Sequence, residues 1–358
     1  MIGWYAHHHG RGHVARALAV SAACDEPLTV FSSRPALGVV PLPLDVEAPR
    51  SPACAATPTP PGLHYAPVGV AGVRRRMAII AAWIDEVDPD LFVVDVSVEV
   101  ALLVRLLGVP SVVLRQHGRR DDEAHLRAYR SATSLVAPYP RWLEDPWVPE
   151  WIREKTYYSG GFSRFDGRTG ERVAARARVG LKPHDRVVVV LPGEGGGAGA
   201  WPVATAAAAA PAWNWIALGS GWDGIAGPGW VKDPFDWLVA ADVVVTHAGH
   251  NAVMECAAVG APMVVIPQDR PYDEQGHKAH RLAEHGLAIV CPRWPDPAAW
   301  PLILDTAVDA QAGAVARVVD GGSEPLVDGN GARRLARHLQ RLAAQMRGQS
   351  VVTVSTQD

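Results

Sequence analysis

Residues 242–275 contain a polar turn between two apolar segments, and the residue types in this turn suggest a binding site. A β-branched run at 243–245 indicates a buried strand, and apolar residues at helical spacing follow at 252–259. The turn residues that can donate hydrogen bonds are His247, Gly249 and His250. The first N–H groups of a helix are unpaired and carry partial positive charge, so this turn suits a diphosphate. Glu255, about one turn into the helix, is placed to accept hydrogen bonds from the two hydroxyls of a ribose.

A polar loop follows the next expected strand, at 263–266. The carboxyl ends of parallel strands meet at one edge of a sheet, so this loop should lie beside the turn. Its candidate ligands for sugar hydroxyls are Asp269, Glu274 and Gln275.

Two further glycine-rich turns follow strand patterns at 2–8 and 186–191. The first contains Gly10 and Gly12, but it lacks the third glycine of a dinucleotide fingerprint, so a dehydrogenase is disfavoured. The second contains Gly195 and Gly196, whose backbone can approach a phosphate.

Each of these turns lies between an expected strand and an expected helix, so strands and helices alternate along the chain. A chain of 358 residues is too long for one ordinary hydrophobic core. We therefore expect an α/β protein of two Rossmann-like parallel-sheet domains facing across a cleft. The expected divisions are residues 1–160, a linker at 161–185, a second domain at 186–330, a helix at 331–347 and a tail at 348–358.

Composition excludes several classes of function. A net charge of −3 does not indicate nucleic-acid binding. The four cysteines are scattered and indicate neither a disulfide framework nor a zinc site. No run of eighteen apolar residues and no signal peptide is apparent, so a cytoplasmic protein is expected. Arginines at 74–76 beside an apolar helix leave peripheral contact with the inner membrane face as an alternative to an ordinary core-facing helix.

Residues 242–275 resemble the donor-binding region of GT-B glycosyltransferases. The branch is the one that contains the lipid II N-acetylglucosaminyltransferase and the small-molecule UDP-glycosyltransferases. The shared elements are HAGHNAVMECAAVGAPMVVIP and a following DEQ, in the family's order. The resemblance implies an enzyme that transfers a hexosyl or N-acetylhexosaminyl unit from a nucleotide diphosphate sugar, most simply a UDP-sugar. It adds Asn251 to the donor-binding residues and places Val231 in the loop that holds the nucleobase.

The resemblance also assigns the first turn to the acceptor domain. The family's Gly-x-Gly-His-x-x-Arg turn is matched by Gly10, Gly12, His13 and Arg16, and His117 ends a strand at the same edge. His13 is the expected general base because histidine titrates near neutrality. Asp95, at the end of a neighbouring strand, is its expected carboxylate partner, with His9 and Glu99 as substitutes.

Transfer would be inverting and metal-independent, with no cofactor besides the nucleotide-sugar co-substrate, because nothing in residues 242–275 resembles an Asp-x-Asp metal motif. The family's Asp-Gln is Glu-Gln here, so Asp269 or Glu274 can be the carboxylate that binds the sugar. The acceptor is left open among small-molecule, lipid-linked and polysaccharide alcohols. A UDP-sugar 2-epimerase of the same fold and a non-catalytic nucleotide-sugar-binding subunit are the alternatives.

Overall fold

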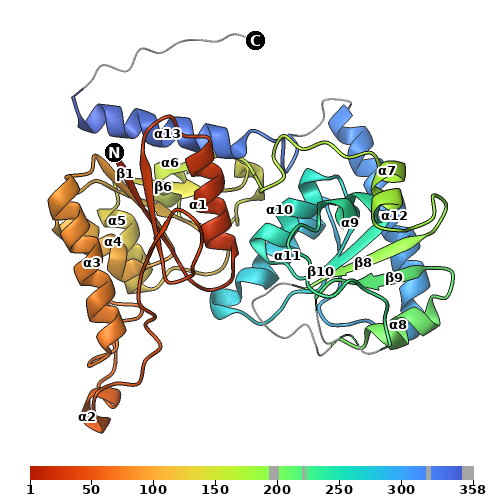
Figure 1. Ribbon diagram of the computed structural model, residues 1–358, viewed down its shortest axis with the longest axis horizontal. Helices are drawn as coiled ribbons and strands as arrows, with labels where there is room; N and C mark the ends of the chain where they lie inside the picture. Colours follow the sequence, from red (N-terminus) through yellow and green to blue (C-terminus); the bar gives the residue numbers. More distant parts are fainter. Residues whose placement is uncertain (193–200, 220–221, 223, 320–323, 349–358) are drawn as a thin grey trace.

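The computed structural model describes residues 1–192, 201–219, 222, 224–319 and 324–348. Within these residues the chain forms two parallel sheets, each covered by helices (Figure 1). This architecture confirms the predicted α/β fold class. The predicted glycine-rich loop with Gly195 and Gly196 lies outside the described residues.

The first sheet has the order β3-β2-β1-β4-β5-β6-β7, and every pairing in it is parallel. Its strands are β1 (Ile2–Ala6), β2 (Leu28–Ser32), β3 (Val39–Pro41), β4 (Leu91–Asp95), β5 (Ser111–Leu114), β6 (Ser134–Ala137) and β7 (Thr156–Tyr158). The helices of this part are α1 (Gly12–Ala22), α2 (Pro52–Ala55), α3 (Ala71–Val87), α4 (Val98–Leu106), α5 (Glu123–Ser131) and α6 (Glu150–Lys155). Strands β1 and β4 are buried along their whole length, as expected for a sheet covered on both faces.

The second sheet has the order β12-β11-β10-β8-β9 and is also parallel. Its strands are β8 (Val187–Leu191), β9 (Asn214–Ala217), β10 (Val243–Thr246), β11 (Met263–Val265) and β12 (Ile289–Val290). The helices around it are α7 (Arg172–Arg178), α8 (Val203–Ala209), α9 (Phe235–Ala240), α10 (His250–Ala258), α11 (Glu274–Glu284) and α12 (Trp300–Val319). Strands β8 and β10 are valine-rich, and their β-branched side chains favour an extended, buried backbone.

The last helix, α13 (Gly331–Met346), returns to the first domain and lies along it beside α1 (Figure 1). Its apolar face includes Leu335 and Leu339, which are fully buried in one cluster with Ile2 and Trp4 of β1. Just beyond the helix, Arg347 forms ion pairs with Glu26 at 2.7 Å and Asp90 at 2.6 Å. The helix therefore completes the core of a domain whose strands lie at the other end of the sequence.

Strand register explains where the polar residues of the first domain meet. Ala6, the last residue of β1, pairs with Asp95, the last residue of β4. The turn after β1 therefore begins beside the Asp95 carboxylate. Among the described residues, no helix is long and apolar enough to cross a membrane.

Candidate active site between the two domains

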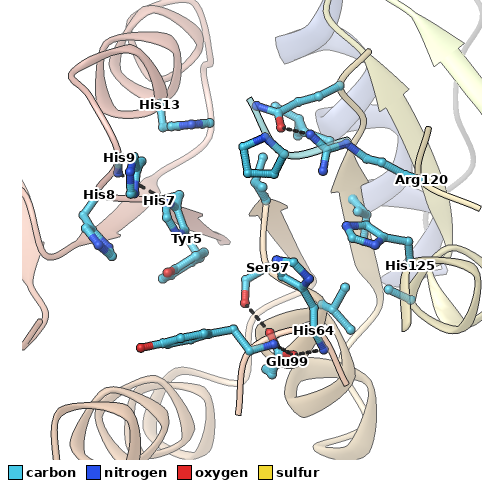
Figure 2. Close-up of a pocket in the computed structure, with 18 of the residues that line it drawn as sticks. Tyr5, His7, His8, His9, His13, His64, Ser97, Glu99, Arg120 and His125 are labelled. Atoms are coloured by element: carbon cyan, nitrogen blue, oxygen red, sulfur yellow. Dashed lines mark hydrogen bonds between the residues drawn. The ribbon is translucent and has the colours of Figure 1, made fainter. Parts of the chain in front are cut away.

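A cavity of about 480 Å³ lies at the carboxyl edge of the first sheet and is closed on one side by a segment of the second domain. Its size falls within the range of small-molecule binding sites. Figure 2 shows its lining, in which imidazole and phenol rings are frequent. The histidines that line it are His7, His8, His9, His13, His64 and His125.

His13 and Asp95 are adjacent in this site. The Nδ1 atom of His13 lies 3.0 Å from Oδ1 of Asp95, whose side chain is fully buried. Arg16, one turn further along α1, approaches the same carboxylate at 3.1 and 3.3 Å. Burial raises the pKa of Asp95, but the charges of Arg16 and His13 outweigh it, so the pKa lies below its usual value. An ionised Asp95 that faces Nδ1 leaves Nε2 of His13 to accept a proton.

Two other residues predicted to bind the acceptor, Arg16 and His117, are buried away from the cavity. Arg16 is buried against Asp95 and does not line the cavity, so it holds the carboxylate and is not placed to contact an acceptor. His117 is only 1% exposed, stacked on Tyr139 with ring centroids 4.3 Å apart, and is likewise absent from the lining. The prediction that it contacts an acceptor does not fit this burial. Gly10 has φ +72 and lets the chain turn into α1.

The turn at the start of α1 touches the second domain directly. A Cβ atom at Gly12 would overlap the side-chain amide of Asn251, in the first turn of α10. His250 begins the same helix, and burial, with Arg16 and Lys278 nearby, holds its pKa well below the usual value. The N-terminus of α10, where a diphosphate is predicted, therefore faces the His13 turn closely. No side-chain cap occupies that N-terminus, because its N-cap residue is Gly249.

His247 has an internal role in the described structure. Its Nδ1 atom lies 2.8 Å from the carbonyl oxygen of Ile266, and its ring packs on Trp201 at 4.1 Å. The residue is 2% exposed, and burial lowers the pKa of the imidazole. These contacts tie β10 to the end of β11. They leave His247 less available to a phosphate than predicted.

Glu255 lies in α10 and is held by an arginine that sequence patterns did not indicate. Nε of Arg164 donates to Oε1 of Glu255 at 2.8 Å, and its Nη1 donates to the Lys232 carbonyl at 2.8 Å. Arg164 thus joins the predicted ribose ligand to the predicted nucleobase loop, in which Val231 packs against the domain core. Burial raises the pKa of Glu255, which the Arg164 charge opposes.

The predicted sugar-binding loop divides into an outer and an inner part. Asp269 is exposed and does not line the cavity, whereas Glu274 and Gln275 do. Gln275 accepts a hydrogen bond from the Gln268 N–H at 3.0 Å, which orients its amide. Glu274 pairs with Arg120 of the first domain at 3.0 Å. Of the two carboxylates left open by the sequence, the structure brings Glu274 to the cavity.

The two substitutes for the His13–Asp95 pair also line the cavity, together with His64 and Tyr65, which the sequence did not indicate. Glu99, one of the two substitutes, accepts hydrogen bonds from the backbone N–H groups of His64 at 2.6 Å and Tyr65 at 2.7 Å. It therefore orders the loop that carries His64. His9, the other substitute, is exposed, and its ring stacks on that of His7 with centroids 5.7 Å apart. No group of three or more histidine, cysteine or acidic side chains within the described ranges could hold a metal ion.

Two Rossmann-like domains that face each other across such a site define the GT-B class. Residues 236–293 match the glycosyltransferase family 28 C-terminal domain. The chain thus has the GT-B fold, and its second domain contains a glycosyltransferase family 28 C-terminal domain, as its sequence motifs predicted.

The solved structures that it resembles share its fold over nearly the whole chain. The glycosyltransferase of kitacinnamycin has a TM-score of 0.65 at 18% identity and covers 95% of this chain and 98% of its own. MurG of Acinetobacter baumannii has a TM-score of 0.61 at 15% identity, and the match covers 95% of this chain and 99% of MurG.

Curated relatives match shorter parts. An uncharacterized glycosyltransferase of Methanopyrus kandleri is 29% identical over 108 residues, 30% of this chain and 29% of its own. The UDP-N-acetylglucosamine–N-acetylmuramyl-(pentapeptide) pyrophosphoryl-undecaprenol N-acetylglucosamine transferase of Oceanobacillus iheyensis is 26% identical over 183 residues, 48% of this chain and 50% of its own. The chain therefore spans half or less of the length of these curated relatives.

Proposed function

We propose that this protein transfers a sugar from a nucleotide diphosphate sugar, a UDP-sugar in the first instance, to a hydroxyl group of an acceptor. The observation that carries this proposal is the His13–Asp95 pair at 3.0 Å, because its histidine lines a cavity that the second domain closes on one side. The family 28 match on the donor side supports the same reading.

In the proposed reaction His13 removes the proton of the acceptor hydroxyl as its oxygen bonds to the anomeric carbon. The bond between that carbon and the diphosphate oxygen breaks, and the nucleoside diphosphate leaves. Attack from the face opposite the leaving group inverts the anomeric configuration. Asp95 stabilises the imidazolium that forms, and general-base catalysis of this kind contributes typically ~10²–10⁴ in rate.

The leaving diphosphate would lie at the N-terminus of α10. Unpaired N–H groups and the helix dipole stabilise its negative charge there without requiring a metal ion. Glu255 would bind the ribose hydroxyls, with Arg164 fixing the carboxylate. Glu274 and Gln275 would bind the sugar, because both line the cavity.

Nucleotide binding is the first test. In a thermal-shift screen with UDP, dTDP, UDP-sugars and NAD, we expect stabilisation by the uridine or thymidine ligands and none by NAD. The glycosyltransferase VinC, of the same fold, was solved in complex with dTDP, which makes the thymidine arm necessary. No stabilisation by any of these nucleotides would contradict the proposal.

Catalysis is the second test. His13→Ala should retain the thermal shift with UDP and lose acceptor-dependent UDP release. The matched control is His280→Ala, whose side chain is 71% exposed on α11 and should change neither quantity. Adding EDTA should leave transfer unchanged, and NMR of the product should show an inverted anomeric centre. Epimerised sugar from UDP-sugar alone would instead identify an epimerase.

A further inference from the structure

Tyr272 belongs to the second domain, but its side chain packs against residues of the first. Its hydroxyl group lies 2.8 Å from Nδ1 of His64. Its ring meets that of His125 edge to face, with centroids 4.9 Å apart, and lies 4.7 Å from the guanidinium carbon of Arg120. These three partners all line the cavity together with Tyr272 itself. The phenol therefore forms a wall between the predicted sugar-binding loop and the acceptor side.

The backbone fixes this ring in place. Tyr272 has φ +64 and Asp273 has φ +51, left-handed conformations that cost free energy for residues other than glycine. The Tyr272 carbonyl oxygen accepts a hydrogen bond from the Arg119 N–H at 2.9 Å. A Cβ atom at Gly118 would lie 2.6 Å from that same oxygen, so only glycine allows this approach. Two backbone segments from opposite domains thus hold Tyr272 over the cavity.

The charges around the cavity are largely engaged by one another. The charged residues that line it are Asp45, Glu99, Glu274, Arg76, Arg120 and Arg270. Arg76 pairs with Asp45 at 2.6 Å, and Arg120 pairs with Glu274 at 3.0 Å. Arg270 donates to the Gln268 amide oxygen at 3.0 Å. An anionic acceptor buried here would have to break one of these arrangements to find a counter-charge.

The remaining lining combines aliphatic side chains with aromatic rings, and two of its imidazoles are uncharged at neutral pH. Burial lowers the pKa of His7 to about 2 and that of His125 to about 4, so both rings are neutral. Tyr5 and Tyr129 add buried rings. Neutral rings of this kind pack well against another ring and supply single hydrogen bonds to hydroxyl groups.

We propose that Tyr272 determines acceptor specificity, closing the cavity over a compact, uncharged, ring-containing alcohol or phenol and excluding an acceptor with an anionic head group. This inference rests on the proposed function, because it assigns the cavity to the acceptor of that reaction. Aromatic contact between Tyr272 and the acceptor, within a volume of about 480 Å³, would bring the reactive hydroxyl to His13.

Equilibrium dialysis with two compounds tests the inference without requiring sugar transfer. The compounds are 2-naphthol, which is neutral, and 2-naphthyl phosphate, which adds a charged group to the same rings. The proteins are the wild type, Tyr272→Ala, Tyr272→Phe and the control Asp273→Asn. Asp273 is the neighbouring left-handed residue, its side chain is 71% exposed, and asparagine tolerates the same backbone.

We expect 2-naphthol to bind the wild type about 10-fold more tightly than 2-naphthyl phosphate. Tyr272→Ala should weaken 2-naphthol binding roughly 3- to 10-fold, while Tyr272→Phe, which retains the ring, and Asp273→Asn stay within about 2-fold. Equal or tighter binding of the phosphate, no binding of either compound to the wild type, or an unchanged affinity in Tyr272→Ala would overturn the inference. A UDP thermal shift in each variant reports separately on folding and on the proposed function.

Discussion

Asp95→Asn is the substitution that probes the site most directly. Asparagine preserves the shape of the side chain but removes a charge that is completely buried. Arg16, whose side chain is 4% exposed, would then have a buried charge without its carboxylate. Breaking a buried ion pair by removing one partner typically costs about 3–5 kcal/mol. We expect the free energy of unfolding to fall by that amount in urea denaturation followed by circular dichroism.

A surface pair provides the control for this loss. Asp305 pairs with Arg186, and the two side chains are 54% and 47% exposed. Asp305→Asn should therefore cost less than about 1 kcal/mol. The wild type should also lose the Asp95 contribution as the pH falls, because the folded-state pKa lies below its ordinary value of 3.8. That contribution is present above the ordinary pKa, and Asp95→Asn should lack this part of the acid dependence.

A double-mutant cycle then tests the chemical role. We expect His13→Ala to reduce kcat by ~10²–10⁴, because it removes the general base. If Asp95 acts through His13, adding Asp95→Asn to His13→Ala should reduce kcat little further. Independent, multiplicative losses in the double variant would refute the pairing. A UDP thermal shift retained in all three variants would show that the donor site is intact.

Three other substitutions test separate parts of the structure. Gly12→Ala places a methyl group against Asn251, so it should lower kcat in steady-state assays by holding the domains apart; an unchanged kcat would show that this close approach is not needed. Glu255→Ala should raise the Kd for UDP roughly 10- to 100-fold in calorimetry, because charged hydrogen bonds to the ribose are lost; an unchanged Kd would remove Glu255 from the site. His338 stacks on Tyr157 at 3.9 Å, and burial lowers its pKa from 6.5 to about 4. Since the unfolded chain then binds the extra proton, stability should fall between pH 6.5 and 4, and His338→Phe should reduce that fall by about 2–3 kcal/mol.

Much of the fold could be predicted from the sequence because its signals are local. Valine-rich strands, glycine turns and helical spacing lie within short windows, and they indicated two parallel sheets before any contact was known. The proximity of His13 and Asp95 was also predictable, since both follow the carboxyl ends of strands in one sheet. The strand register pairs Ala6 with Asp95, so the turn that leads to His13 begins beside the carboxylate.

The residues that the sequence did not reveal act through contacts between distant segments. Arg164 reaches Glu255 across 91 positions, and Tyr272 reaches His64 across 208. No spacing rule records such pairs, because they exist only once the two domains have docked. His117 shows the opposite limit: a polar residue at a strand end looked available, but Tyr139 and the loop around it bury the ring.

The return of α13 to the first domain has a consequence for how the protein is made. The face of β1 that contains Ile2 and Trp4 is covered by a helix that leaves the ribosome about 330 residues later. Until that helix emerges, the newly made first domain exposes an apolar surface that chaperones can recognise. For the same reason, a fragment that ends near residue 160 should aggregate when expressed alone. Supplying residues 324–348 as a separate peptide should restore its solubility, as in fragment complementation.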